Sequence, residues 1–239
     1  HRNSGGRMST VETNLVQPST GTTLTLGASG DTIAVGSGAS TSGFASGLAS
    51  VQTFTSSGTW TRPSDITKVI MEVQGAGGGG SKGADADYNM NGAGGGYAKK
   101  FLDVSSISTS TITVGTGGAG VGYGTTGNGG TGGNSVWSDG TNTITGSGGG
   151  GGQNAYYVLS PGGTGTGGDV NIQGCSRAGD VSTGGGPSML GVGGQMGLPT
   201  PVAGAVDGKG YGGGGCTWSG YSQDTGAGSA GIVIVWEYK

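Results

Sequence analysis

The sequence predicts an all-β fold, in which a short β-stem precedes a β-sandwich-like glycine-rich tip with packed polyglycine-II helices. Three observations predict it. Glycine accounts for 63 of the 239 residues and falls mostly in runs. The segments between the runs are rich in Val, Ile, Thr and aromatic residues, which favour strands. Several of these segments alternate apolar and polar residues with a period of two, and none shows helical periodicity.

The composition limits the classes of protein to consider. Only 10% of the residues are charged, whereas disordered chains are usually highly charged, so we expect a folded domain. Collagen is excluded, because glycine does not recur at every third residue and only 6 prolines are present. The net charge of −3 gives no basic patch, so no nucleic-acid partner is expected. No apolar stretch is long enough to cross a bilayer, so no membrane insertion is expected.

The chain divides into three parts. Residues 1–8 resemble a cloning remnant and are left out of the fold prediction. Residues 9–50 are expected to form fibre-stem or linker repeats, because Leu24–Leu26 and Ile33–Val35 are short alternating strands. Two such units bury little in a monomer and more in three chains wound together; the alternative is a flexible linker. Residues 51–239 are expected to form the glycine-rich tip domain.

Eight strands are expected in this domain from the pattern of apolar and β-branched residues. Their ranges are 51–55, 59–61, 67–74, 97–104, 110–114, 135–138, 141–145 and, closing the domain, 231–238. In the third, Val69, Met71 and Val73 share one face. Asp139-Gly140 is the strongest short hairpin signal in the chain. Apolar residues on both faces of the closing strand indicate a central strand, which we expect to pair with strand 67–74 or its neighbour.

The glycine runs are expected to be a packing element. Polyproline-II geometry has three residues per turn and no internal hydrogen bonds. Only glycine lets such backbones approach closely enough to bond each other's N–H and C=O groups. The core of this region is then backbone, which explains how the chain folds with 31% hydrophobic residues.

The chain offers few groups for catalysis, and no enzyme activity, cofactor or metal is expected. The only histidine is His1, in the presumed remnant, which removes histidine-dependent catalysis and ligation. Residues 75–82 (GAGGGGSK) follow a strand but lack the Gly-Lys-Ser/Thr order and the helix of a phosphate-binding loop. Cys175 and Cys216 are either a disulfide pair or two free thiols.

Four inserts interrupt the glycine runs and are the expected binding loops, at residues 84–91, 153–161, 187–206 and 216–224. The residues predicted to contact a receptor are Tyr88, Asn89, Tyr156, Tyr157, Trp218 and Tyr221. Tyr, Trp, Ser, Asn and Gly are typical of binding loops, because they combine rigid amphipathic area with adaptable hydrogen bonding. The alternative is that the aromatic residues cap the ends of the glycine layer as ordinary packing.

Four stretches carry a resemblance to a known family. Gln52–Gly80, Gly162–Gly174 and Gly228–Tyr238 resemble segments of the glycine-rich domain of bacteriophage tail-fibre and tail-tip proteins. Gly21–Ser42 resembles the repeats that precede this domain in fibre proteins of marine phages. In similar adhesins of T-even-like phages, layered polyglycine-II helices carry variable loops that contact the receptor. Those adhesins attach to a separate fibre, whereas this chain has its own stem-like repeat, so a homotrimer is expected.

The resemblance implies a virion protein of the tail fibre that acts outside the host cell. Its function is adhesion to a bacterial surface receptor, either a glycan or an outer-membrane protein, and its other partners are tail-fibre subunits. Two alternatives stay open at this point. One is a structural glycine-rich filament without a specific ligand. The other is a polysaccharide depolymerase that acts through Asp85 and Asp87.

Overall fold

The computed structural model describes residues 47–83, 89–155, 158–177, 184–195, 206–217 and 223–239. The chain divides into two units, His1–Phe44 and Ala45–Lys239, and all the described residues belong to the second. This unit is all-β, as predicted, and contains no helix within the described ranges. The expected strands at 24–26 and 33–35 lie outside them.

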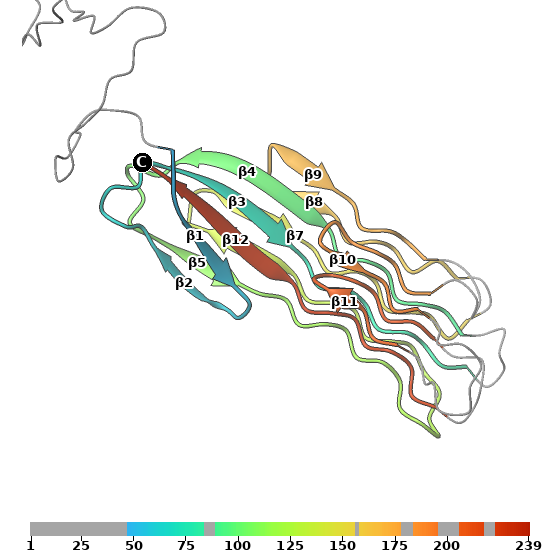
Figure 1. Cartoon of the computed structure of the whole chain (residues 1–239). Coiled ribbons are helices and arrows are strands. Elements are labelled where there is room, and N and C mark those ends of the chain that lie inside the picture. Colours follow the sequence, from blue (N-terminus) through green and yellow to red (C-terminus); the bar gives the residue numbers. More distant parts are fainter. Residues whose placement is uncertain (1–46, 84–88, 156–157, 178–183, 196–205, 218–222) are drawn as a thin grey trace, which may run out of the picture. The chain divides into compact units, whose positions relative to one another are not determined.

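Two five-stranded antiparallel sheets form one end of the unit (Figure 1). Sheet A has the order β1 (Leu48–Phe54), β12 (Ile232–Tyr238), β3 (Lys68–Gln74), β4 (Tyr97–Asp103) and β9 (Val170–Ile172). Sheet B has the order β2 (Gly58–Thr61), β5 (Thr109–Thr113), β6 (Ser135–Ser138), β7 (Thr143–Gly146) and β8 (Gly165–Thr166). A separate two-stranded ribbon joins β10 (Gly191–Val192) to β11 (Lys209–Gly210).

The two sheets enclose a side-chain core. Val69, Met71 and Val73 of β3 are fully buried, which confirms that they share one face and shows that this face points into the core. Sheet B contributes Trp60 and Trp137, whose rings lie 6.4 Å apart between centroids at a tilted angle. Large aromatic rings bury much apolar area, so this pair stabilises the contact between the sheets.

The predicted positions of the closing strand and the hairpin are confirmed. β12 lies between β1 and β3, and its pairing with β3 runs from Ile232 opposite Gln74 to Tyr238 opposite Lys68. β6 and β7 form the predicted hairpin, but β7 begins at Thr143. The loop has four residues, 139–142, because the Asp139 carboxylate accepts hydrogen bonds from the backbone N–H groups of Thr141 and Asn142. Gly140 has a φ of +93°.

A buried carboxylate fastens the edge strand β1 to the rest of sheet A. Glu237 of β12 is 1% exposed and points into the sandwich. Its carboxylate accepts hydrogen bonds from Gln52 Nε2 and Trp60 Nε1, both at 2.7 Å, and from the Ser50 hydroxyl. A buried carboxyl group needs hydrogen-bond partners, and these three donors supply them.

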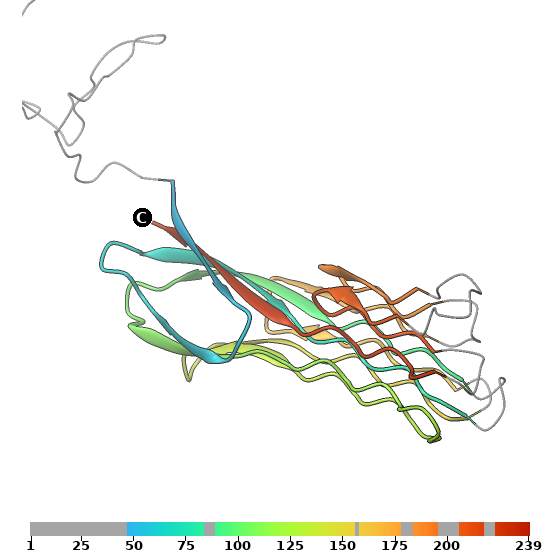
Figure 2. The same cartoon turned by 60° about the horizontal axis from the view of Figure 1, so that its bottom comes forward.

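The glycine runs leave the sheets and extend side by side away from them (Figures 1 and 2). The backbone N–H groups of segment 75–82 change partner with a period of three. Counted in threes from Gly75, the first N–H group of each three donates to segment 90–96 and the second to segment 127–133. The third N–H group donates to segment 226–229. The carbonyl groups of the same segment accept backbone hydrogen bonds from three further segments, which are 115–121, 146–152 and 212–216. One backbone is therefore bonded directly to six others.

These contacts leave no room for side chains. A Cβ atom added to Gly78 would lie 2.1 Å from the carbonyl oxygen of Gly150, and one added to Gly92 would lie 2.0 Å from that of Gly78. Both distances are far inside van der Waals contact, and backbone atoms held by neighbours cannot move aside. The prediction that backbone forms the core of this region is therefore confirmed at these positions.

We expect Gly78→Ala to destabilise the domain by about 3 kcal/mol or more, because the added methyl group overpacks a backbone core. Gly127→Ala is the matched control, since no atom lies within 4 Å of its added Cβ. The control should leave stability unchanged or raise it by about 0.4–1 kcal/mol. Chemical denaturation followed by circular dichroism measures both, and equal effects of the two substitutions would contradict a core of packed backbone.

Candidate binding site

The first, second and fourth predicted inserts depart from the glycine segments at the end away from the two sheets (Figures 1 and 2). The third insert begins nearer the sheets, because it contains β10 and the backbone N–H of Leu190 donates to the side chain of Gln74 at the end of β3. The structure describes the residues from which the inserts depart, such as Gly83 and Asn89. Five of the predicted receptor-binding residues lie outside the described ranges, namely Tyr88, Tyr156, Tyr157, Trp218 and Tyr221. Their predicted role stays a prediction.

The sixth predicted residue, Asn89, belongs to the base of the first insert. It is 4% exposed, and its side-chain oxygen accepts a hydrogen bond from the backbone N–H of Gly83. Ser81 closes the same base, because its hydroxyl accepts from the N–H of Met90 at 2.7 Å. Asn89 thus holds the two ends of the insert together, and its contact with a receptor stays a prediction.

Buried hydroxyl groups fix the base of the fourth insert. Thr217 Oγ1 donates to the carbonyl oxygen of Ser81, and Thr225 Oγ1 donates to that of Gly80, both at 2.7 Å. The backbone N–H of Thr217 donates to the Asn91 side chain. Near their ends the glycine segments have fewer backbone neighbours, and these short polar side chains supply the missing partners. Sequence reasoning missed them, although polar residues at the ends of glycine runs are a usable signal.

Backbone hydrogen bonds connect the ends of the second and third inserts to neighbouring segments. Ser160, near the end of the second insert, exchanges both backbone hydrogen bonds with Arg177. The backbone N–H of Cys216, where the fourth insert begins, donates to the carbonyl oxygen of Val206, where the third insert ends, at 3.2 Å. Cys175 and Cys216 are both free thiols, which settles the alternative left open by the sequence. Burial raises the pKa of the Cys216 thiol, and its sulfur accepts a hydrogen bond from the backbone N–H of Val206.

A polar hollow of about 350 Å³ lies beside the bases of the third and fourth inserts. Asp207 and Asp224 line it, and each carboxylate accepts a backbone N–H, from Ala227 and Tyr123 respectively. Nearby, Lys82 Nζ donates to the carbonyl oxygen of Gln223 at 2.6 Å and lies 5.5 Å from the centroid of the Tyr123 ring. This end of the domain therefore presents fixed hydrogen-bonding groups beside the inserts.

A comparison with protein families assigns the fold. Residues 50–238 match the glycine-rich domain family. The chain belongs to this family. No curated protein matches the chain by sequence. The match covers both sheets and all the glycine segments, so the sandwich and the packed backbones together make up the glycine-rich domain.

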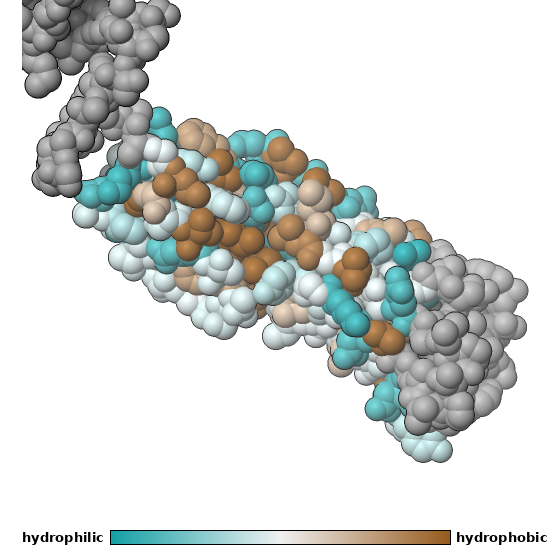
Figure 3. Space-filling view, in the orientation of Figure 1, coloured by the Kyte–Doolittle hydropathy of each residue, from teal (hydrophilic) through white to brown (hydrophobic). Residues whose placement is uncertain are grey.

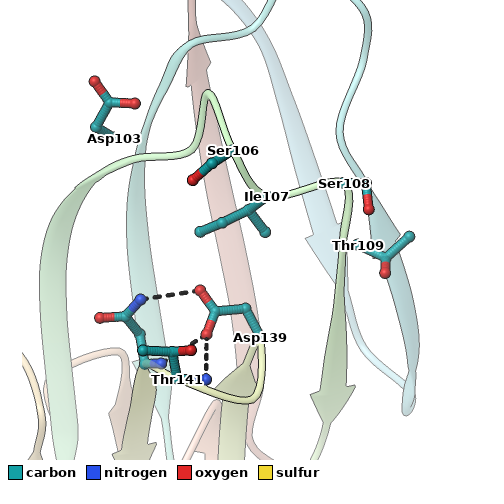
Figure 4. A pocket seen from close by; sticks show the side chains of 8 residues that line it. Asp103, Ser106, Ile107, Ser108, Thr109, Asp139 and Thr141 are labelled. Carbon is teal, nitrogen blue, oxygen red and sulfur yellow. Dashed lines mark hydrogen bonds between the residues drawn. The ribbon is translucent and has the colours of Figure 1, made fainter.

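The glycine-rich domain has a second hollow, of about 420 Å³, at the sheet end (Figure 4). Asp103 and Asp139 lie on different sides of it, and the rest of its lining is mostly hydroxyl and amide groups. Burial acts to raise the pKa of Asp139, but hydrogen bonds from Asn142 and Thr141 outweigh it and lower this pKa. Hydrogen bonds from Ser105 lower the pKa of Asp103.

No group of three or more His, Cys, Asp or Glu side chains that could hold a metal occurs in the part of the glycine-rich domain that the structure describes. Within those same residues no helix is long and apolar enough to span a membrane. Asp85 and Asp87, the carboxylates of the depolymerase alternative, lie outside the described ranges.

Thr217→Val and Thr225→Val should each destabilise the glycine-rich domain by about 1–3 kcal/mol, because each leaves a buried carbonyl group without its donor. Thr111→Val is the matched control, since Thr111 is exposed on sheet B and should change stability by less than about 0.5 kcal/mol. Urea denaturation gives the three values. Equal stabilities would show that water replaces the two hydroxyl groups.

The lowered pKa of Asp139 predicts a loss of stability in acid. A carboxyl group with a lowered pKa in the folded state stabilises the protein above its unfolded pKa of about 3.8. That contribution is lost as the pH falls through the lower, folded pKa. We expect the melting temperature to fall between about pH 5 and about pH 2 and to fall less steeply in Asp139→Asn. Parallel curves for the two proteins would contradict this assignment.

Proposed function

We propose that this chain is the tip of a bacteriophage tail fibre, an adhesin that binds a host-cell receptor through its inserts. One observation supports it above the others. The packed glycine segments bring the bases of separate inserts to one end of the domain and fix them there with buried hydrogen bonds. Loops positioned by a rigid scaffold are a common arrangement for recognition.

The proposed contacts come from the aromatic and polar residues of the inserts. Tyrosine and tryptophan offer large contact areas at a low cost in conformational entropy. The receptor is a surface glycan or an outer-membrane protein of the bacterium, and the protein acts on the virion, outside the cell, without catalysis. Copies joined in a homotrimer through residues 9–50 would present several sets of inserts, so weak individual contacts add up to strong attachment.

The proposal includes the polyglycine-II conformation of the glycine segments. Their hydrogen bonds change partner with a period of three, which is the number of residues per turn in this geometry. A helix of this kind directs successive N–H groups to three different sides and so suits a bundle in which each backbone has neighbours all round. Such a bundle is a rigid support for the inserts.

The test replaces the aromatic residues of the inserts together, in Tyr156→Ser, Tyr157→Ser, Trp218→Ser and Tyr221→Ser. We expect the labelled variant to lose at least about tenfold in binding to host cells, because it loses several aromatic contacts of the kind that dominate interfaces. Tyr211→Ser, a partly exposed tyrosine outside the inserts, is the control and should bind normally. Circular dichroism checks that both variants remain folded.

The outcomes separate the proposal from its alternatives. Full binding by the folded quadruple variant would favour a structural filament without a specific ligand. Release of reducing sugars from purified capsule or lipopolysaccharide, abolished by Asp85→Asn with Asp87→Asn, would establish the depolymerase. Protease treatment of the cells distinguishes the two receptor classes, since binding to a glycan survives it.

A further inference from the structure

A fifth loop, outside the four inserts, lies at the end of the domain away from the sheets (Figures 1 and 2). This tyrosine loop, residues 122–126, connects glycine segments 115–121 and 127–133, and the structure describes it over its whole length. Its Tyr123 is 66% exposed, more than any other large apolar side chain that the structure describes. An exposed tyrosine on a loop is a typical contact residue of binding proteins.

Local hydrogen bonds fix the backbone of the tyrosine loop. The backbone N–H and the hydroxyl group of Thr125 both donate to the carbonyl oxygen of Gly122, at 3.3 and 2.7 Å. Gly124 has a φ of +74°, as the third residue of a type II turn requires. At the base of the loop, Lys82 and Gly127 exchange both backbone hydrogen bonds. The loop therefore holds its tyrosine in place by contacts that do not involve the inserts.

One face of the Tyr123 ring lies toward a buried cation. Lys82 Nζ is 5.5 Å from the centroid of the ring, within the range of a cation–π contact. The lysine is 3% exposed, and its Nζ donates to the carbonyl oxygen of Gln223 at 2.6 Å. Because Tyr123 itself is 66% exposed, the opposite face of its ring is open to solvent. The ring is thus an oriented platform with one free face.

The hollow of about 350 Å³ adjoins this platform. Gly122, which precedes the tyrosine, lines the hollow, and so does Asp224, whose carboxylate accepts the backbone N–H of Tyr123. Asp207 lines it as well, and its carboxylate accepts the backbone N–H of Ala227. A carboxylate has about four acceptor positions, so both exposed aspartates keep capacity for hydrogen bonds from a ligand.

The charges and the polarity of this end favour a neutral, hydroxyl-rich ligand. Asp207 and Asp224 are exposed, whereas Lys82 is buried beneath the ring, so the accessible charge of the site is negative. A negative site disfavours phosphate and carboxylate groups. Figure 3 shows brown apolar atoms gathered over sheet A, whereas hydrophilic and weakly polar atoms lie at the lower right, where the tyrosine loop ends.

A neutral pyranose fits both parts of the site. Its hydroxyl groups donate to carboxylates in charge-assisted hydrogen bonds. The C–H groups on one face of the sugar ring pack against the electron-rich face of an aromatic ring. A hollow with a few placed polar groups beside an aromatic side chain is a common form of ligand site.

We propose that Tyr123 and the hollow beside it form a saccharide site, which takes neutral sugar units of a glycan on the bacterial surface. One sugar unit lies in the hollow against Asp207 and Asp224, and the glycan continues over the Tyr123 ring. The inference rests on the proposed function and deepens it, because it selects a glycan from the two receptor classes. The site adjoins the proposed contacts of the inserts, since Asp207 follows the third insert and Asp224 ends the fourth.

Binding of simple sugars to the full-length protein tests the site directly. The probes are the methyl glycosides of glucose, galactose and mannose, followed by saturation-transfer difference NMR, with glucose 6-phosphate as the anionic comparison. At least one neutral glycoside should bind, and more tightly than the phosphate. Tyr123→Ser should weaken that binding by at least about tenfold, because it removes an aromatic contact. Tyr123→Phe is the matched control and should stay within about threefold of the parent, because it keeps the ring.

Binding to protease-treated bacterial cells tests the site on its natural ligand. Tyr123→Ser should again bind at least about tenfold more weakly than the parent. Asp207→Asn and Asp224→Asn should each weaken binding by about threefold or more, because a charge-assisted hydrogen bond becomes a neutral one. Asp65→Asn, an exposed aspartate between β2 and β3, is the control and should bind normally. Purified capsule and purified lipopolysaccharide, added as competitors, identify the source of the glycan.

The outcomes distinguish this inference from the proposed function. The saccharide site would be overturned if folded Tyr123→Ser bound protease-treated cells as tightly as the parent, or if the phosphate bound better than every neutral glycoside. It would also be overturned if protease treatment abolished cell binding and no glycoside bound. In each case the adhesin proposal would stand as long as the quadruple insert variant lost cell binding. Full binding by that variant, with loss in Tyr123→Ser, would instead support the saccharide site and contradict the role of the inserts.

Discussion

The fold depends on hydrogen bonds between backbones that lie too close together for side chains. In an ordinary domain the sheets are bonded by backbone and held to one another by side chains. In the glycine segments the backbone does both, since segment 75–82 is bonded to six neighbours and a Cβ atom at Gly78 or Gly92 would overlap a carbonyl group. The loss of conformational entropy on ordering glycine is large, and this dense bonding offsets it.

The two halves of the domain support each other. The sandwich supplies an apolar core and fixes the register of the strands from which the glycine segments continue, as β3 does for segment 75–82. The bundle carries that register to its other end, where Ser81, Thr217 and Thr225 replace backbone partners by side-chain hydroxyl groups. The position of each insert is therefore decided by a chain of hydrogen bonds that begins in the sheets.

The sequence predicts the parts of this arrangement that have a local pattern. The alternation of β3, the hairpin at Asp139-Gly140 and the central place of β12 follow from residues close together in the chain. The strands β8 to β11 are too short to show any period. The burial of Glu237 depends on Ser50, Gln52 and Trp60, which are more than 170 residues away, so no local pattern indicates it. The burial of Asn89 depends on the hydrogen bond that its side-chain oxygen accepts from the backbone N–H of Gly83, and not on a periodic pattern in the sequence.

A core made of peptide groups has a thermal consequence. Exposing apolar surface raises the heat capacity of unfolding by about 0.45 cal/K/mol per Å², whereas exposing polar surface lowers it by about 0.26. The glycine segments bury mainly N–H and C=O groups, so they add little to the heat capacity change that the sandwich produces. The stability curve of the domain is therefore flatter than that of a side-chain core of equal length. Cooling weakens hydrophobic burial, but the end of the domain that carries the inserts is held by hydrogen bonds, which persist in the cold.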